Sequence, residues 1–353
     1  MGILDRWLKK TPRDIGIDLG TSNTLLFIQD RGVVINEASV VAINSRTGQI
    51  LAVGREALKM QGKTPPHLQV VQPLVDGVIS DFEVAEKMLK YFFDRVNREQ
   101  RLLGRRPRVV IGIPLDVTEV EKKAVEDAVV SAGAREVFLV PTVLAAAVGA
   151  RLPIQDASGN MLIDSGGGVT QVAVVSLSGV VASKSLRVAG TEVDLDLVNY
   201  ARQEFNLLVG ERVAEEAKLF FSRSKEGAPL PEVKLRGRDL LTGLPREVKL
   251  TGDHATTAFR KSLKSLVDGI KSTLEVTPPE LVADIYQRGI TLVGGGAQLL
   301  GFRQAIVEAT KMNVVIIDDP MTCAVRGMGM LLEDAGLLAE VTVPSSQQEE
   351  TVR

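Results

Sequence analysis

Two segments of the sequence place an aspartate just before a glycine-containing turn, a combination that suits phosphate chemistry. Asp18 precedes the turn at 20–23, and Asp164 precedes the turn Ser165–Thr170. Glycine lets the backbone approach a ligand without a side-chain clash, and successive backbone N–H groups form anion-binding concavities. Hydroxyl and amide side chains add donors. The residues predicted to bind phosphate are Gly20, Thr21, Ser22, Asn23, Gly166, Gly167 and Gly168.

The two aspartates are the candidates for metal chemistry. Each ends a segment whose composition predicts a buried strand, so both carboxylates are expected to face a turn. Two carboxylates beside phosphates suit a Mg²⁺ ion held largely through water. Plain glycine-containing hairpins are the alternative for either segment alone, and two matching copies favour the functional interpretation. The residues predicted to act in catalysis are Asp18, Asp164, Thr170 and Gln171.

A third glycine run follows the predicted strand Ile290–Val293 and precedes the predicted helix Gly301–Thr310. It resembles a surface on which an adenine or ribose can lie, although glycine triplets often only end strands. The sequence contains no G-x-x-x-x-G-K-[ST] motif, which excludes a P-loop, and a dinucleotide fingerprint is not satisfied either. The glycines predicted to contact the nucleoside are Gly294, Gly295 and Gly296.

The elements that must position these turns repeat along the chain. Hydrophobic patterning predicts a strand on each side of each turn. The two strand–turn–strand units therefore predict an internal duplication of an α/β unit, with one Asp-x-Gly hairpin in each copy. Between them, Thr118 and Glu121 form a capping-box pattern that predicts a helix up to Ala132. The predicted strands are Asp14–Gly20, Thr24–Ile28, Met161–Asp164 and Gln171–Leu177.

Composition narrows the functional class. The net charge of −2 argues against a nucleic-acid-binding protein, which usually carries a basic excess. The only cysteine, Cys323, rules out an internal disulfide and fits a reducing compartment. No apolar run reaches the ~18–20 residues that span a bilayer, and the N-terminus lacks the apolar core of a signal peptide. We therefore expect a protein inside the cell with no nucleic-acid partner.

Several longer stretches carry a resemblance to a known family. The chain is similar to the actin, heat-shock-70 and sugar-kinase superfamily and, within it, to the bacterial MreB family of actin-like, rod-shape-determining proteins over nearly the whole sequence. The similar stretches are Ile15–Thr24 (IGIDLGTSNT), Asp76–Phe82 (DGVISDF), Arg106–Pro114 (RPRVVIGIP), Asn206–Glu211 (NLLVGE), Arg236–Pro245 (RGRDLLTGLP), Thr277–Asp284 (TPPELVAD), Gly294–Gly301 (GGGAQLLG) and Asp319–Cys323 (DPMTC).

The resemblance implies an α/β, actin-like duplicated fold with two lobes around a central nucleotide cleft, and ATP with Mg²⁺ as the ligands. It implies self-assembly into filaments that direct cell shape and cell-wall synthesis. The expected location is cytoplasmic, peripheral on the inner face of the cell membrane, with membrane-embedded cell-wall synthesis proteins as partners. The family's nucleotide contacts also fall on Glu215, Lys218 and Ala297. Without the resemblance, Glu215 and Lys218 would be interpreted as a solvated charge pair on a helix.

The sequence departs from the family pattern around the expected attacking water, which suggests a divergent paralogue. The family segment Ile-Glu-Glu-Pro-Met-Ala-Ala-Ala stands here as Val140–Ala147, with Pro141 and Thr142 in place of the two glutamates. The second hairpin has Val169 and Gln171 where the family has threonine and glutamate. Phosphoryl transfer depends mainly on positioning and charge stabilisation. The departures therefore predict ATP binding with slow or lost hydrolysis. The alternative is that Gln171 or Thr142 orients the water and keeps hydrolysis active.

The N-terminus and one loop are candidates for contact with a membrane. Met1–Lys10 (MGILDRWLKK) places its apolar residues on one helical face beside basic residues, as in segments that lie in a membrane interface. A frayed tail, or a helix packed on the protein itself, is the alternative. A second apolar pair stands within a basic loop. The residues predicted to contact the membrane are Ile3, Leu4, Trp7, Leu8, Leu102 and Leu103.

The predicted organisation is an amphipathic tail at 1–13, a first lobe at 14–147 plus 320–340, a second lobe at 148–319, and a disordered tail at 341–353. Two other functional classes stay open on this fold. One is a small-molecule kinase or a chaperone-type ATPase, and the other is a membrane scaffold that does not polymerise. Fold alone does not separate them.

Overall fold

The computed structural model describes residues 14–100, 106–224 and 230–344. By their contacts, the residues form two compact units. The described residues of unit 1 fall within 1–157, 176–179 and 322–353, and those of unit 2 within 158–175 and 180–321.

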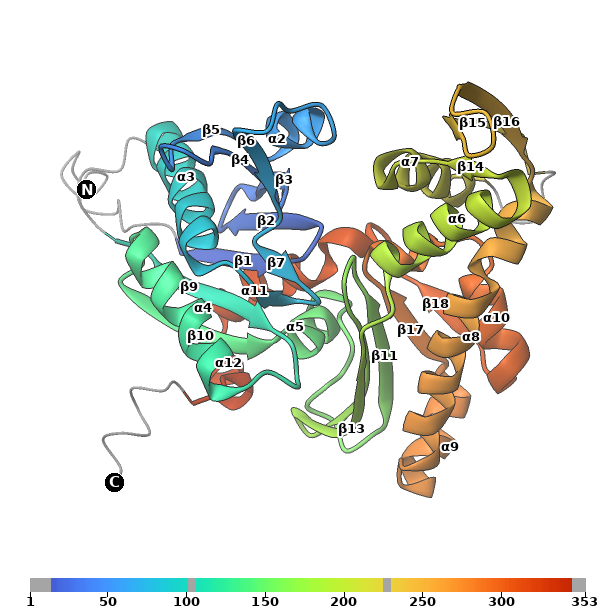
Figure 1. Ribbon diagram of the computed structural model, residues 1–353. Coiled ribbons are helices and arrows are strands. Elements are labelled where there is room, and N and C mark those ends of the chain that lie inside the picture. The colour runs from blue at the N-terminus through green and yellow to red at the C-terminus, as the bar shows by residue number, and fades with distance from the viewer. Residues whose placement is uncertain (1–13, 101–105, 225–229, 345–353) are drawn as a thin grey trace. The chain divides into compact units, whose positions relative to one another are not determined.

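Unit 1 is built on a five-stranded sheet with the order β10-β9-β1-β2-β3 (Figure 1). The central strand β1 pairs in parallel with β9 and antiparallel with β2, and β9 pairs in parallel with β10. The carboxyl ends of β1, β9 and β10 therefore lie at the same edge of the sheet. The strands are β1 (Ile15–Leu19), β2 (Asn23–Ile28), β3 (Gly32–Ala38), β9 (Arg108–Ile113) and β10 (Glu136–Pro141).

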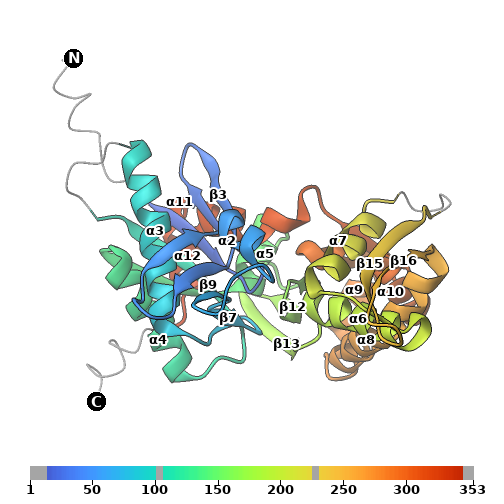
Figure 2. The ribbon, with the colours of Figure 1, turned by 45° about the horizontal axis from the view of Figure 1, so that its top comes forward.

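Both faces of this sheet are covered by helices, and the strand period of two decides which residues face which side. The residues Ile15, Ile17 and Leu19 pack into one core with α3 (Phe82–Gln100) and α4 (Glu119–Ala132), which lie beside each other (Figures 1 and 2). The opposite face receives α11 (Cys323–Glu333). Gly16 permits that approach, because a Cβ there would lie 3.0 Å from the Cβ of Met328.

The capping box predicted for α4 is confirmed. The Thr118 hydroxyl accepts from the Glu121 N–H, and the Glu121 carboxylate accepts from the Thr118 N–H. The remaining elements of unit 1 are the small sheet β5-β4-β6 with α2, the hairpin β7–β8, and two further helices. Their bounds are β4 (Val41–Asn44), β5 (Ile50–Val53), α2 (Arg55–Met60), β6 (Leu68–Val71), β7 (Leu74–Val75), β8 (Val78–Ile79), α5 (Thr142–Gly149) and α12 (Ala335–Val341). The short helix η2 (Pro320–Thr322) begins in unit 2 and leads into α11 of unit 1.

Unit 2 is built on a second five-stranded sheet with the order β13-β12-β11-β17-β18. The central strand β11 pairs antiparallel with β12 and in parallel with β17, and β17 pairs in parallel with β18. This matches unit 1 strand for strand, with β11, β12, β17 and β18 in the places of β1, β2, β9 and β10. The strands are β11 (Asn160–Ser165), β12 (Thr170–Ser176), β13 (Gly179–Leu186), β17 (Ile290–Val293) and β18 (Val314–Ile316). The predicted duplication is confirmed.

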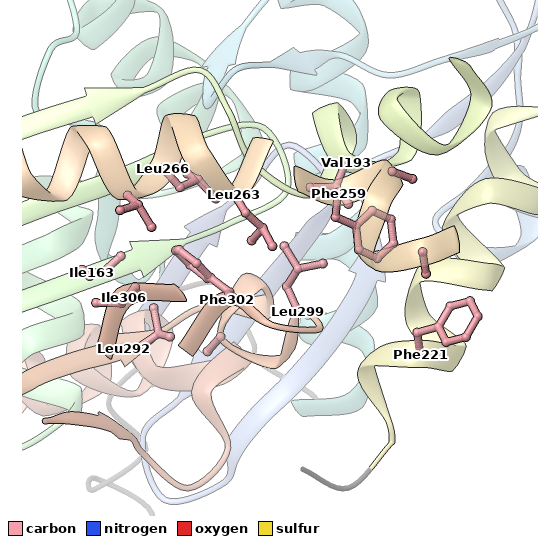
Figure 3. Close-up of a cluster of buried hydrophobic side chains, with 14 of the residues drawn as sticks. Ile163, Val193, Phe221, Phe259, Leu263, Leu266, Leu292, Leu299, Phe302 and Ile306 are labelled. Carbon is pink, nitrogen blue, oxygen red and sulfur yellow. The ribbon is translucent and has the colours of Figure 1, made fainter. Parts of the chain in front are cut away.

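The unit 2 core joins this sheet to helices α6, α8 and α10. Figure 3 shows Leu263 of α8 beside Phe302 of α10, with Phe259 of α8 in the same cluster, and all three are buried. A small sheet with the order β14-β15-β16 lies beside α7 (Figures 1 and 2). The bounds are α6 (Gly190–Phe205), β14 (Leu207–Leu208), α7 (Glu211–Ser222), β15 (Val233–Asp239), β16 (Pro245–Leu250), α8 (Gly252–Glu275), α9 (Pro279–Arg288), η1 (Gly295–Gln298) and α10 (Phe302–Thr310).

The segment predicted to be disordered from residue 341 is ordered at its start. Val341 is buried, and the N–H of Val343 donates to the carbonyl of Leu139 at 2.9 Å. Pairing with an edge strand and burial of valines outweigh the polar composition of the residues that follow. Residues 345–353 lie outside the described part of the chain.

Candidate functional site

The first predicted turn closes the hairpin between β1 and β2. The Gly20 N–H donates to the Asn23 carbonyl at 3.1 Å, which fixes a four-residue turn. A Cβ on Gly20 would lie 2.7 Å from that carbonyl oxygen, so the turn requires glycine. Thr21, Ser22 and Asn23 are half-buried, which leaves part of each residue accessible to a ligand.

Ser39, just after β3, holds this turn from outside. Its hydroxyl donates to the Gly20 carbonyl at 2.6 Å, and its N–H donates to the Ser22 carbonyl at 3.0 Å. In a trans peptide the C=O and the next N–H point in opposite directions. The N–H groups of Thr21 and Asn23 are therefore directed away from Ser39 and can meet an anion.

Thr21 is tied to a second loop. Its hydroxyl oxygen accepts from the Gly77 N–H at 2.8 Å, in the turn between β7 and β8. With its oxygen fixed in this way, the Thr21 hydroxyl proton stays available for a ligand oxygen.

Asp18 stands on β1, two residues before the turn, and pairs with Leu25 of β2. Burial raises the pKa of Asp18 to about 6. A carboxylate whose charge is penalised in this way gains from a nearby cation, because an opposite charge favours the ionised form.

The second predicted turn closes the hairpin between β11 and β12 in the same way. The Gly166 N–H donates to the Val169 carbonyl at 2.9 Å, and Asp164 pairs with Gln171 as Asp18 pairs with Leu25. The N-terminus of α6 holds this turn. The N–H of Gly190 donates to the Gly166 carbonyl at 3.2 Å, and the N–H of Thr191 donates to the Gly167 carbonyl at 2.8 Å.

This arrangement also directs backbone donors outward. Because the carbonyls of Gly166 and Gly167 point to α6, the N–H groups of Gly167 and Gly168 point away from it. Two consecutive N–H groups with this orientation form an anion-binding concavity. The Thr191 hydroxyl adds a donor to the Gly167 carbonyl at 2.9 Å.

Lys218 lies behind this turn and is nearly buried. Its ammonium donates to the Gly190 carbonyl at 2.9 Å and to Oδ2 of Asp194 at 2.7 Å. Burial raises the pKa of Asp194 to about 6, while the charge and hydrogen bond of Lys218 lower it. The other oxygen, Oδ1, is buried with no hydrogen-bond partner among the described residues. The direct contacts of Lys218 are thus with α6.

The two residues of β12 predicted to act in catalysis are buried. Thr170 is 0% exposed, and its hydroxyl donates to the Val188 carbonyl at 2.8 Å. Gln171 is 2% exposed. In unit 1 the same position as Thr170 is held by Thr24, which is buried as well. The catalytic role of Thr170 and Gln171 stays a prediction.

The third glycine run packs against the end of β11. A Cβ on Gly294 would lie 2.6 Å from Oδ1 of Asp164, and a Cβ on Gly296 would collide with Ser165. Close approach to the second hairpin therefore accounts for both glycines. Gly295 is exposed and Ala297 is buried in η1.

The predicted nucleotide contacts of unit 2 lie on the hairpin, on η1 and on α7. Glu215 is half-buried on α7, three residues before Lys218, and its charge raises the pKa of Asp194. In the described part of the chain, no group of three or more acidic, histidine or cysteine side chains forms a metal-binding cluster. The Mg²⁺ role of Asp18 and Asp164 stays a prediction; each carboxylate stands one residue before the end of the central strand of its own unit.

Sequence patterns alone did not identify three residues that position the turns, namely Ser39, Thr191 and Asp194. Ser39 stands 19 residues after the glycine it contacts. Thr191 and Asp194 lie in the first turns of α6, and Thr191 stands 24 residues after the Gly167 carbonyl that it contacts. The sequence gives only a weak signal for these residues, because a Gly-Thr pair at the start of a helix is common. The predicted membrane residues Ile3, Leu4, Trp7, Leu8, Leu102 and Leu103 lie outside the described residues.

The family model and the most similar known proteins point to the same family. The model of the family described as MreB/Mbl protein matches residues 12–340. The chain is 44% identical over 322 residues to the cell shape-determining protein Mbl of Bacillus cereus, covering 91% of this chain and 96% of that protein. It is 42% identical over 324 residues to the cell shape-determining protein MreB of Escherichia coli, covering 91% and 93%.

Solved structures agree in fold. MreB5 of Spiroplasma citri bound to ADP superposes with a TM-score of 0.87 at 34% identity, covering 92% of this chain and 97% of that one. A MamK double helical filament gives a TM-score of 0.75 at 23% identity, covering 91% and 98%, and supports the fold alone. The predicted actin-like, two-lobed α/β fold is confirmed.

Proposed function

The chain belongs to the MreB/Mbl family, and we propose that it is a cytoskeletal protein that binds ATP with Mg²⁺, assembles into membrane-associated filaments and directs cell shape and cell-wall synthesis. Its relatives with 42–44% identity are cell shape-determining proteins. The partners we propose are further copies of the chain, the inner membrane surface and membrane-embedded cell-wall synthesis proteins.

The observation that carries ATP binding is the orientation of backbone donors in both hairpins. The carbonyls of Gly20, Ser22, Gly166 and Gly167 are held by other parts of their own unit, so the following N–H groups point to the other side. Donors fixed in this way bind phosphate oxygens without further ordering. Relatives with 34% and 33% identity were solved with ADP and AMPPNP.

Calorimetric titration of the full chain with ATP, ADP and AMP, with and without Mg²⁺, tests this proposal. Asp18→Asn and Asp164→Asn should weaken the Mg²⁺ dependence of ATP binding about tenfold or more. Asp127→Asn, an exposed carboxylate on α4, is the matched control and should leave binding unchanged. A wild-type chain that binds no ATP, or variants with unchanged Mg²⁺ dependence, would contradict the proposal.

We propose further that hydrolysis is slow. Pro141 is buried directly before α5, and Thr142 opens that helix with its hydroxyl packed against Gly112. Neither residue provides a carboxylate to orient a water. Losing a water-orienting group lowers the rate while leaving ATP binding intact, because positioning and charge stabilisation supply most of the catalysis.

Phosphate release at saturating ATP measures this directly, with E. coli MreB as the reference. We expect the chain to be at least about tenfold slower, which corresponds to about 1.4 kcal/mol in the barrier. The double variant Pro141→Glu/Thr142→Glu should raise the rate, with its thermal unfolding measured as the control for folding. Wild-type turnover equal to the reference would disprove the slow-hydrolysis proposal.

Assembly and membrane association need their own tests. Among the helices that the structure describes, none is both long enough and apolar enough to cross a bilayer. We propose peripheral attachment through residues 1–13 and the pair Leu102–Leu103. Electron microscopy of the protein with ATP and anionic vesicles should show filaments on the vesicle surface. Vesicles that bind the protein but carry no filaments would favour a non-polymerising scaffold. If deletion of residues 1–10 leaves co-sedimentation of the protein with vesicles unchanged, the tail is excluded as a membrane-attachment segment.

A further inference from the structure

We propose that Ser39 is a positioning residue for phosphate binding, which holds the first hairpin so that the N–H groups of Thr21 and Asn23 stay directed at the ligand. The inference rests on the proposed ATP binding and adds a residue to it. Ser39 follows β3, and we propose that it acts through the turn without touching the ligand itself.

Three polar contacts converge on Ser39, which is 0% exposed. Its hydroxyl donates to the Gly20 carbonyl at 2.6 Å, and its N–H donates to the Ser22 carbonyl at 3.0 Å. The hydroxyls of Thr24 and Ser39 are 2.9 Å apart. One residue thus fixes two peptide planes of the turn from one side.

The direction of the third contact follows from counting protons. A serine hydroxyl has one proton, and that of Ser39 goes to the Gly20 carbonyl. The Thr24 hydroxyl must therefore donate to the Ser39 oxygen. Of these two side chains, only that of Ser39 contacts a carbonyl of the turn.

The consequence for a ligand is preorganisation. Without the Ser39 hydroxyl, the Gly20–Thr21 peptide would be free to rotate and to point its carbonyl oxygen at the phosphate instead of its N–H. A preorganised donor loses less conformational entropy on binding than a mobile one, which must be ordered first. The benefit is specific to anionic ligands, so affinity for a nucleoside without phosphate should not depend on Ser39.

The matched pair Ser39→Ala and Thr24→Val tests the assignment. Both remove one buried hydroxyl from the same hydrogen-bonded pair, and only Ser39→Ala frees the Gly20 carbonyl. We expect Ser39→Ala to weaken ATP and ADP binding about tenfold and adenosine binding less than twofold. Thr24→Val should change all three affinities less than about threefold, although both variants lower the melting temperature.

A second measurement uses the wild-type chain and does not depend on the folding of a variant. In hydrogen exchange, the amides of Thr21 and Asn23 should exchange fast without nucleotide and slow at least about tenfold with ATP and Mg²⁺. The Ser39 amide, which is bonded to Ser22, should be protected in both conditions.

The outcomes separate the two proposals. Wild-type ATP binding with equal losses in Ser39→Ala and Thr24→Val, or with equal losses for ATP and adenosine, would overturn the role of Ser39 and leave ATP binding standing. Thr21 and Asn23 amides that are already protected without nucleotide would also overturn it. Absence of ATP binding by the wild-type chain would remove both proposals.

Discussion

The two hairpins have the same backbone arrangement, but different kinds of contact hold them in place. In both, a glycine N–H donates across a four-residue turn, at 3.1 Å from Gly20 and at 2.9 Å from Gly166. The first turn is held by the neutral hydroxyl and N–H of Ser39. The second is held by the N-terminus of α6, which is fixed in turn by the buried ion pair of Lys218 and Asp194.

The difference shows that two turns with the same backbone geometry can differ in how much stability is lost when a supporting contact is removed. A buried hydroxyl that loses its partner costs little more than one hydrogen bond. A buried carboxylate that loses its partner leaves an uncompensated charge. Removing a supporting side chain should therefore destabilise the protein more at the second hairpin than at the first, while phosphate binding should depend on the support of both hairpins.

The largest expected effect comes from breaking the ion pair. Lys218→Met leaves Asp194 buried and unpaired, and should lower the free energy of unfolding by about 3–5 kcal/mol. Urea denaturation at neutral pH measures the change. Adding Asp194→Asn to Lys218→Met should recover most of the loss. If the single variant loses less than Ser39→Ala does, the contrast between the two hairpins is wrong.

The next largest effect is a pH-dependent gain in stability when Asp18 of the first hairpin is replaced by asparagine. Because burial raises the pKa of Asp18 from 3.8 to about 6, its contribution to stability is fully present below pH 3.8 and is lost as the pH rises through about 6. Asp18→Asn should therefore be more stable than the wild type at pH 8, by about 3 kcal/mol. The gain should vanish near pH 4. Thermal unfolding across pH 4–8, without nucleotide or Mg²⁺, checks this, and a pH-independent gain would contradict it.

A smaller effect compares the two turn glycines. A Cβ would lie 2.7 Å from the Asn23 carbonyl in Gly20→Ala but 3.2 Å from the Val169 carbonyl in Gly166→Ala. We expect Gly20→Ala to destabilise more, by a difference of about 1 kcal/mol. Chemical denaturation of both variants gives the ranking, and the reverse order would show that the two turns differ in a way the contacts do not explain.

The smallest effect belongs to Thr191. Its hydroxyl and its N–H both donate to the Gly167 carbonyl, so Thr191→Val keeps the backbone bond. Stability should fall by less than about 0.5 kcal/mol, and ATP affinity should stay within about twofold. A loss as large as that of Ser39→Ala would mean that the second turn also depends on a side-chain hydroxyl.

The sequence predicted the hairpins but not what holds them. The strand pattern around Asp18 and Asp164 is local, since neighbouring residues decide it, and both hairpins formed as expected. The contacts of Ser39 with Gly20 and of Thr191 with Gly167 join residues 19 and 24 positions apart. Lys218 was placed beside the nucleotide by resemblance, and the structure bonds it to Gly190 and Asp194.

By itself, the sequence determined the duplicated α/β plan, the two Asp-x-Gly turns and the glycines that such turns need, because periodicity and glycine content act over a few neighbouring residues. Only the tertiary structure decided that Thr170 and Gln171 are buried, that Gly294 and Gly296 serve close packing against β11, and which groups hold each turn. Those outcomes depend on segments distant in the sequence meeting in space, and the burial and hydrogen bonds that result follow from the packing of the whole unit.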